Sequence, residues 1–104
     1  MSNYDQRCAE DARLAILAEL AQQDDATLNS RSLARIVEAV VPRRPREWIE
    51  TQLDWLKSMG AIRLTKSDLP GLGPVSIAVL TRTGRDHVEQ RTRLSGITAP
   101  ADVE

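Results

Sequence analysis

The chain has 104 residues, a formal net charge of −1 at pH 7 and a hydrophobic fraction of 41%. A chain of this length normally forms one domain with a modest core. No segment approaches the roughly 18 apolar residues of a membrane helix, and no signal-peptide pattern is present, so we expect a cytoplasmic protein without a membrane partner. Cys8 is the only cysteine and His87 the only histidine, which excludes an intrachain disulfide and a Cys/His zinc site. We therefore expect no metal and no cofactor.

The nearly balanced charge hides an uneven distribution along the chain. Residues 1–25 contain two Arg and six Asp or Glu, a net charge of −4, whereas residues 26–93 contain twelve Lys or Arg and seven Asp or Glu, a net charge of +5. The positive charge of the middle and C-terminal parts therefore permits them to bind a polyanion.

The first half of the chain predicts a flexible N-terminus and two helices. Residues 1–8 are polar and expected to be flexible. Ala9 to about Gln22 has the apolar spacing of a helix. In the connection that follows, Leu28 is the one apolar residue and is suited to a brief edge strand. Asn29 or Ser30 then offers an N-cap for a second helix, whose apolar positions are Leu33, Ile36, Val37 and Val40.

A third helix is predicted from Arg46 to Met59, and the rest of the domain is organised around it. Pro45 suits its first position, Lys57 its last turn, and Gly60 the left-handed conformation just past its end. One side of this helix is apolar, and the opposite side is mostly acidic because it has Glu47, Glu50 and Asp54.

Two strands and a helix are predicted after Gly60. Apolar residues alternate at 62–64 and again at 75–79, and the turn-forming stretch 67–74 lies between them. Thr81 can cap a last helix from about Arg82 to Arg91, and residues 94–104 are expected to form a C-terminal tail. The order of three helices, two strands and a helix predicts a winged helix-turn-helix. This is a mainly α fold with a small β-hairpin, over residues 9–93.

With these elements in place, the chain resembles the small winged-helix proteins of Mu-like phages and prophages, which are loosely grouped with ArsR-type regulators. The resemblance extends from about Arg13 to Pro100 and implies a phage-type regulatory protein. Metal-responsive regulation is not implied, because the cysteine pairs of metal-sensing ArsR proteins are missing. The residues that carry the resemblance are Ile16-Leu17, Leu53-Asp54-Trp55-Leu56, Gly60, Ile62, Leu80-Thr81, Gly84 and the stretch from Arg91 to Ile97.

DNA binding is the first functional hypothesis. Arg43, Arg44 and Arg46 stand at the N-terminus of the third helix, where they can grip phosphates of double-stranded DNA. Further contacts are expected from residues on or beside the wing, namely Arg63, Lys66 and Arg82. The three carboxylates on the outer helix face argue against DNA, because the phosphates would repel them. The alternative is that the arginines form a solvated turn in a domain that does not bind DNA.

A protein-interaction surface is the second hypothesis, in which the chain is a dimeric adaptor without DNA binding. Trp48 and Trp55 belong to a second stripe along the third helix, and tryptophan is frequent at interface hot spots. Other apolar positions expected to contact a second copy, or another phage or host protein, are Leu69, Leu72, Leu94 and Ile97. Alternatively, both tryptophans fill a core that has no phenylalanine.

The remaining polar residues do not predict an enzyme. His87 lies in a charged helix and is expected at the surface, and the Gly71–Gly73 stretch has the composition of a turn. No combination of nucleophile, base and orienting group can be assembled from this set, so we expect no catalysis.

Overall fold

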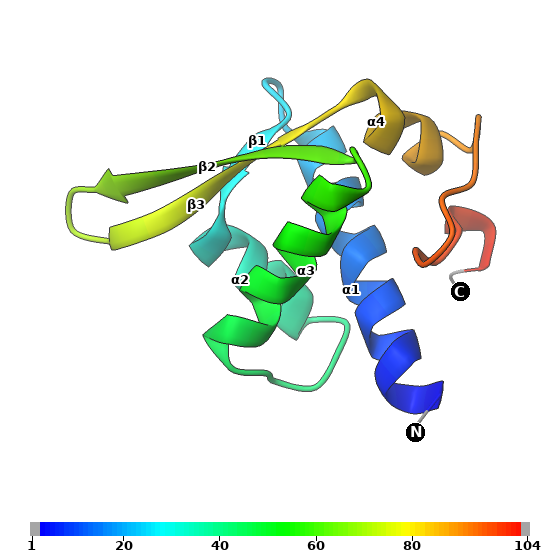
Figure 1. Ribbon diagram of the computed structural model, residues 1–104, viewed down its shortest axis with the longest axis horizontal. Coiled ribbons are helices and arrows are strands. Elements are labelled where there is room, and N and C mark those ends of the chain that lie inside the picture. Colours follow the sequence, from blue (N-terminus) through cyan, green and yellow to red (C-terminus); the bar gives the residue numbers. More distant parts are fainter. Residues whose placement is uncertain (1–2, 103–104) are drawn as a thin grey trace.

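The computed structural model describes residues 3–102, which form an α+β domain of four helices and one three-stranded antiparallel sheet. Helices α1, α2 and α3 lie on one side of the sheet, and the β2–β3 hairpin projects beyond them (Figure 1). The elements are α1 Asn3–Gln22, β1 Thr27–Asn29, α2 Ser30–Glu38, α3 Arg46–Ser58, β2 Ile62–Leu69, β3 Gly73–Leu80, α4 Arg82–Val88 and a 3₁₀ turn Pro100–Asp102.

The signals at the ends of the helices act largely as the sequence predicts. The Asn29 side chain accepts a 3.0 Å hydrogen bond from the Ser32 N–H, and the Thr81 hydroxyl accepts one of 3.2 Å from the Gly84 N–H, so both residues are N-caps. Gly60 follows α3 with a φ of +77°. Pro45 stands one position earlier than expected, as the extended N-cap of α3 rather than its first helical residue.

The sheet has three strands in the order β1–β3–β2. The short strand β1 confirms the edge strand expected around Leu28, which pairs with Ala78. The predicted order of elements omitted this strand because three residues are too few for an alternating pattern. In the hairpin, residues that pair directly share a face of the sheet, so Lys66 lies on the same side as Ser76.

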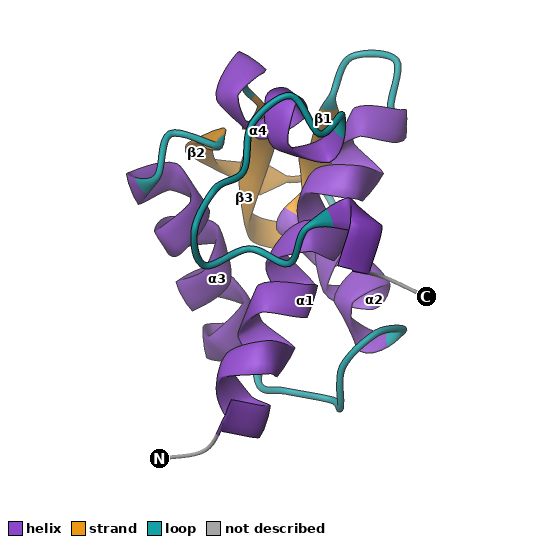
Figure 2. Ribbon diagram, turned by 90° about the vertical axis from the view of Figure 1, so that its right-hand side faces the viewer, coloured by secondary structure: helices purple, strands orange, loops and turns teal. Residues whose placement is uncertain are grey.

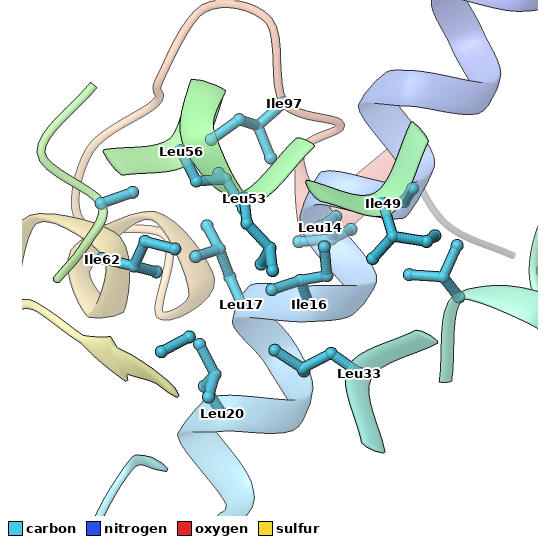
Figure 3. Close-up of a cluster of buried hydrophobic side chains, with 14 of the residues drawn as sticks. Leu14, Ile16, Leu17, Leu20, Leu33, Ile49, Leu53, Leu56, Ile62 and Ile97 are labelled. Carbon is cyan, nitrogen blue, oxygen red and sulfur yellow. The ribbon is translucent and has the colours of Figure 1, made fainter. Parts of the chain in front are cut away.

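The core lies where α1 meets α3, α2 and the inner side of the sheet. Figure 3 shows leucine and isoleucine side chains from these elements converging around Leu17 and Leu53, both of which are completely buried. Ile97 joins the same cluster from the C-terminal segment.

The ends of the domain differ from the prediction. Helix α1 starts at Asn3, so residues 3–8 belong to it, and Cys8 is buried in the core. The residues after Val88 also pack on the domain, because the Thr98 N–H bonds the Glu10 carbonyl of α1 at 3.3 Å. Residues on both sides of the predicted range of 9–93 therefore belong to the packed structure: residues 3–8 continue the helix, and the contacts after Val88 are irregular and leave no periodic pattern in the sequence. Residues 1–2 of the predicted N-terminus and residues 103–104 of the predicted tail lie outside the described residues.

Two helices are shorter than predicted. Helix α2 ends at Glu38, which leaves Val40 exposed and buries Val41 instead. Helix α4 ends at Val88 rather than near Arg91. Within residues 3–102, no helix combines the length and the apolar character needed to cross a bilayer.

Gly84 in α4 provides a test of this packing. A Cβ atom at position 84 would lie 2.3 Å from the Ala61 carbonyl oxygen and 2.8 Å from Leu80 Cδ1, so Gly84→Ala must push α4 away from the sheet. We expect a loss of about 1–3 kcal/mol in the free energy of unfolding, measured by urea denaturation. The exposed neighbour Thr83→Ala is the control and should change it by less than about 0.5 kcal/mol. Equal effects of the two substitutions would contradict this packing.

Candidate nucleic-acid interface

A cleft of about 350 Å³ lies between α2, the connection 42–44 and the first turns of α3. A second depression continues from it toward the hairpin, and the two share Arg46, Glu50 and Pro74. We call the two together the basic cleft. Its cationic residues are Arg31, Arg35, Arg43, Arg44, Arg46 and Lys66. These six cations exceed the three carboxylates of Glu38, Glu50 and Asp68, which gives the cleft a net charge of +3.

Two of these cations come from α2 and are missing from the sequence prediction. Arg31 and Arg35 are exposed and stand one helical turn apart, which places them on the same side of α2. Arg31 Nη2 also donates a 2.8 Å hydrogen bond to the Leu72 carbonyl, so it connects α2 with the turn of the hairpin. Their spacing of four residues, away from the buried Leu33 and Val37, was the signal that could have identified them.

The three arginines predicted at the start of α3 have different environments. Arg43 is 87% exposed and only 3.9 Å from Glu38, and Arg46 is exposed as well. Arg44 is half-buried: its guanidinium lies 5.0 Å from the centre of the Trp48 ring and 3.7 Å from Asp5. Arg44 therefore joins α1 to α3, while Arg43 and Arg46 remain accessible to a ligand.

Lys66 is held at the end of the cleft by a small polar network. Its Nζ donates to the Ser76 hydroxyl at 3.0 Å and lies 3.6 Å from Glu50 Oε1. The Ser76 hydroxyl donates in turn to the same Glu50 oxygen at 3.0 Å, and the Ser76 N–H bonds the Ser30 hydroxyl at 3.0 Å. The network thus connects the hairpin, α2 and α3 at one point, where the Lys66 ammonium group compensates the negative charge of Glu50.

This network changes the acidic face predicted for α3. Glu50 is half-buried and directed toward the hairpin, so only Glu47 and Asp54 remain exposed among the three predicted carboxylates. The exposed residue Thr51 lies between them in sequence and donates its hydroxyl hydrogen to the Glu47 carbonyl at 2.9 Å. The repulsive charge on this face is therefore smaller than the sequence indicated.

The other two residues predicted to contact DNA lie away from the basic cleft. Arg63 is exposed and pairs with Val79, on the sheet face opposite to that of Lys66. Arg82 is exposed at the start of α4, in a depression of mixed charge with Asp86 and Glu89. The structure does not bring these two arginines together with the others.

The two tryptophans pack within their own chain. Trp48 and Trp55 are half-buried against the core, and the Arg13 guanidinium lies 3.9 Å from the centre of the Trp55 ring. Gly96 touches the same ring so closely that a Cβ atom there would lie 2.6 Å from it. Gln52, between the tryptophans, is buried and accepts a 2.9 Å hydrogen bond from Arg13 Nε. These contacts favour the interpretation that the tryptophans complete the core.

The other apolar residues predicted at an interface are also covered in part. Ile97 is only 3% exposed, so its prediction as a contact for another protein is wrong. Leu69 and Leu94 are half-buried, whereas Leu72 is exposed at the turn of the hairpin. This apolar side chain is too isolated to form a patch.

The prediction of a surface position for His87 is wrong. Its side chain is completely buried between α4, where it originates, and the C-terminal segment. The charged residues around it in the sequence hid this position, because α4 is too short to show a clear apolar face. Elsewhere in the part of the chain described, no three His, Cys, Asp or Glu side chains converge to hold a metal ion.

Arg13 is the residue whose loss should affect α1, α3 and the C-terminal segment together. Burial lowers the pKa of its guanidinium, which donates to Gln52 Oε1 and, at 2.8 Å, to the Gly96 carbonyl. We expect Arg13→Ala to reduce the free energy of unfolding by about 2–3 kcal/mol, because buried polar groups lose a charged partner. Arg7→Ala, at an exposed arginine of the same helix, is the matched control and should cost less than about 0.5 kcal/mol in urea denaturation. A cost for Arg13→Ala as small as that of the control would contradict this role.

Comparison with protein-family models, curated proteins and solved structures finds no match to this chain. The function is therefore argued from the basic cleft and the arrangement of the elements around it.

Proposed function

We propose that this chain is a winged-helix protein that binds double-stranded DNA through the basic cleft and acts as a regulatory protein. The order of elements supports the winged-helix assignment, since α1, β1, α2 and α3 are followed by the hairpin β2–β3. In such an arrangement α2 and α3 correspond to a helix-turn-helix pair, and the hairpin corresponds to the wing. The resemblance to regulatory proteins of Mu-like phages points in the same direction, and DNA binding would place its action in the cytoplasm.

The observation that carries the proposal is the convergence of cations from separate elements. Two of the cations, Arg31 and Arg35, come from α2. Arg43 comes from the connection before α3, Arg46 is the first residue of α3, and Lys66 comes from the hairpin, so one phosphate backbone can contact α2, α3 and the hairpin together. Phosphate contacts of this kind provide most of the affinity for DNA and fix the orientation of the protein on the duplex. An α-helix fits the major groove of DNA, which is about 12 Å wide, so α3 can enter the groove while the basic cleft binds the phosphate backbone of the DNA.

The exposed side of α3 limits how the bases can be read. Glu47 and Asp54 are exposed there, and carboxylates accept hydrogen bonds only from base amino groups such as cytosine N4. We therefore propose that phosphate anchoring supplies the affinity and that these two residues reduce it for most sequences. The adaptor hypothesis has less support, because both tryptophans pack against the core of their own chain.

Charge reversal in the cleft should weaken DNA binding. We expect Arg43→Glu with Arg46→Glu to reduce the affinity for a random-sequence duplex at least tenfold at low salt, measured by fluorescence anisotropy. The slope of log affinity against log salt should also become shallower, by about 0.9 for each phosphate that the variant no longer neutralises. The matched control is Arg63→Glu with Arg82→Glu, which makes the same change in charge outside the cleft. Equal decreases in the two double variants, or no DNA binding by the wild type, would contradict the proposal.

Removing the exposed acids should have the opposite effect. We expect Glu47→Gln and Asp54→Gln each to strengthen binding by roughly two- to fivefold at low salt, and less at high salt, because screening already weakens the repulsion. Asp24→Asn, in the exposed turn after α1, removes one charge on another element and is the control. If the two α3 variants bind no more tightly than this control, α3 does not face the DNA.

A further inference from the structure

The C-terminal segment, defined here as residues 93–102, crosses the outside of the helices as a loop that ends in the 3₁₀ turn (Figure 2). Its contacts to α1 are mostly polar: the Thr98 hydroxyl donates to Asp11 at 2.6 Å, and the Gly96 carbonyl accepts from Arg13 at 2.8 Å. Its contribution to the core is limited to the buried Ile97 and the half-buried Leu94. The segment is thus fixed at a few points rather than by a continuous apolar face.

Two of the contacts that fix the segment are made by the two ring nitrogens of His87. His87 Nε2 lies 2.9 Å from the Thr98 carbonyl oxygen, which only accepts, so Nε2 carries the ring hydrogen. His87 Nδ1 accepts a 3.0 Å hydrogen bond from the Leu94 N–H. Both contacts together require the neutral imidazole with its hydrogen on Nε2, and the ring is completely buried.

We propose that His87 is a proton-sensitive latch, which holds the C-terminal segment closed when neutral and releases it when protonated. A second proton has to bind Nδ1, whose lone pair already accepts the Leu94 N–H. Protonation in the closed state would therefore remove that hydrogen bond, set two N–H groups against each other and leave a cation without solvent.

The direction of the pH dependence follows from where the proton can bind. Protonation of the ring is compatible only with an open segment, in which Nδ1 is free of the Leu94 N–H and reaches water. Acid therefore favours the open segment.

Other charged groups also lie on the elements that pack against the segment. Those on α1, on α4 and in the C-terminal region are Arg7, Glu10, Asp11, Arg13, Arg85, Asp86, Glu89, Arg91, Arg93 and Asp102. Asp11 bonds Thr98, Asp86 pairs with Arg91 at 3.7 Å, and Asp102 pairs with Arg93 at 3.4 Å. Asp11 is the carboxylate that bonds the segment directly, so its substitution is the comparison for His87.

Opening of the segment can be distinguished from unfolding of the domain. Leu17, Leu53 and Leu56 are fully buried in α1 and α3, whereas the segment adds only Ile97 and the half-buried Leu94 to the core. The flank of Trp55 under Gly96 would become accessible on release, which makes this tryptophan a reporter of the open state.

Amide hydrogen exchange followed by NMR tests the latch in the full chain. Between pH 7.5 and 5, after correction for intrinsic exchange, protection of the Leu94 N–H should fall by roughly tenfold or more, while that of the Leu56 N–H in α3 stays constant. Nitrogen shifts of His87 should show hydrogen on Nε2 alone at neutral pH. Parallel loss of protection at both amides, an unchanged Leu94, or hydrogen on Nδ1 would overturn the proposal.

Two variants identify the residue whose protonation causes the decrease in Leu94 protection. His87→Gln keeps a donor and an acceptor that do not bind a proton in this range, so the decrease in Leu94 protection between pH 7.5 and 5 should disappear. Asp11→Asn keeps the contact to Thr98 without a titratable group, and this decrease should persist. A transition that disappears in Asp11→Asn would assign it to the carboxylate and refute the latch. If His87→Gln does not fold, hydrogen exchange of the wild type and of the Asp11→Asn variant still tests whether the segment opens in acid.

Discussion

The packing of α1 against α3 is the contact on which the rest of this structure depends. Helix α1 also touches α2, α4 and β3, and four of its side chains are completely buried, namely Ala12, Ile16, Leu17 and Leu20. Apolar burial supplies most of the stability of such a small domain, but it does not fix how two helices are rotated about each other. That orientation is defined by Arg13, which reaches Gln52 in α3 and the Gly96 carbonyl with directional hydrogen bonds.

This arrangement leaves the first turns of α3 at the surface, next to α2 and the hairpin. The basic cleft exists because these three elements meet there, and the Glu50–Ser76–Lys66 network fixes the hairpin against α3. In the proposed function, the net positive cleft directs a polyanion to one place on the surface of a chain whose net charge is −1. The acidic residues Glu47 and Asp54, at the exposed side of the same helix, oppose this attraction, so the balance depends strongly on salt.

Much of the backbone could be predicted from the sequence, because caps, glycines and periodic patterns are local signals. Asn29, Thr81 and Gly60 are examples, and the helix from Arg46 has the predicted start. The positions that were predicted wrongly depend on contacts between distant residues. His87 is buried by a segment that follows α4. Arg44 lines the basic cleft as predicted from its position, but its contacts to Asp5 and Trp48 could not be read from the sequence. Likewise, Glu50 was assigned to the solvated face because its partners, Lys66 and Ser76, lie on the hairpin.

DNA binding by the basic cleft can be tested most directly by an NMR titration of the isotope-labelled protein with a random-sequence duplex at low salt. We expect chemical shifts to change first at the backbone amides of Arg31, Arg35, Arg43, Arg46 and Lys66, and the changes to diminish as salt is added. The C-terminal segment and the surroundings of Trp55 should remain unaffected. Shift changes centred on that segment, or no changes at high protein and DNA concentrations, would contradict the assignment of the basic cleft as a DNA-binding surface.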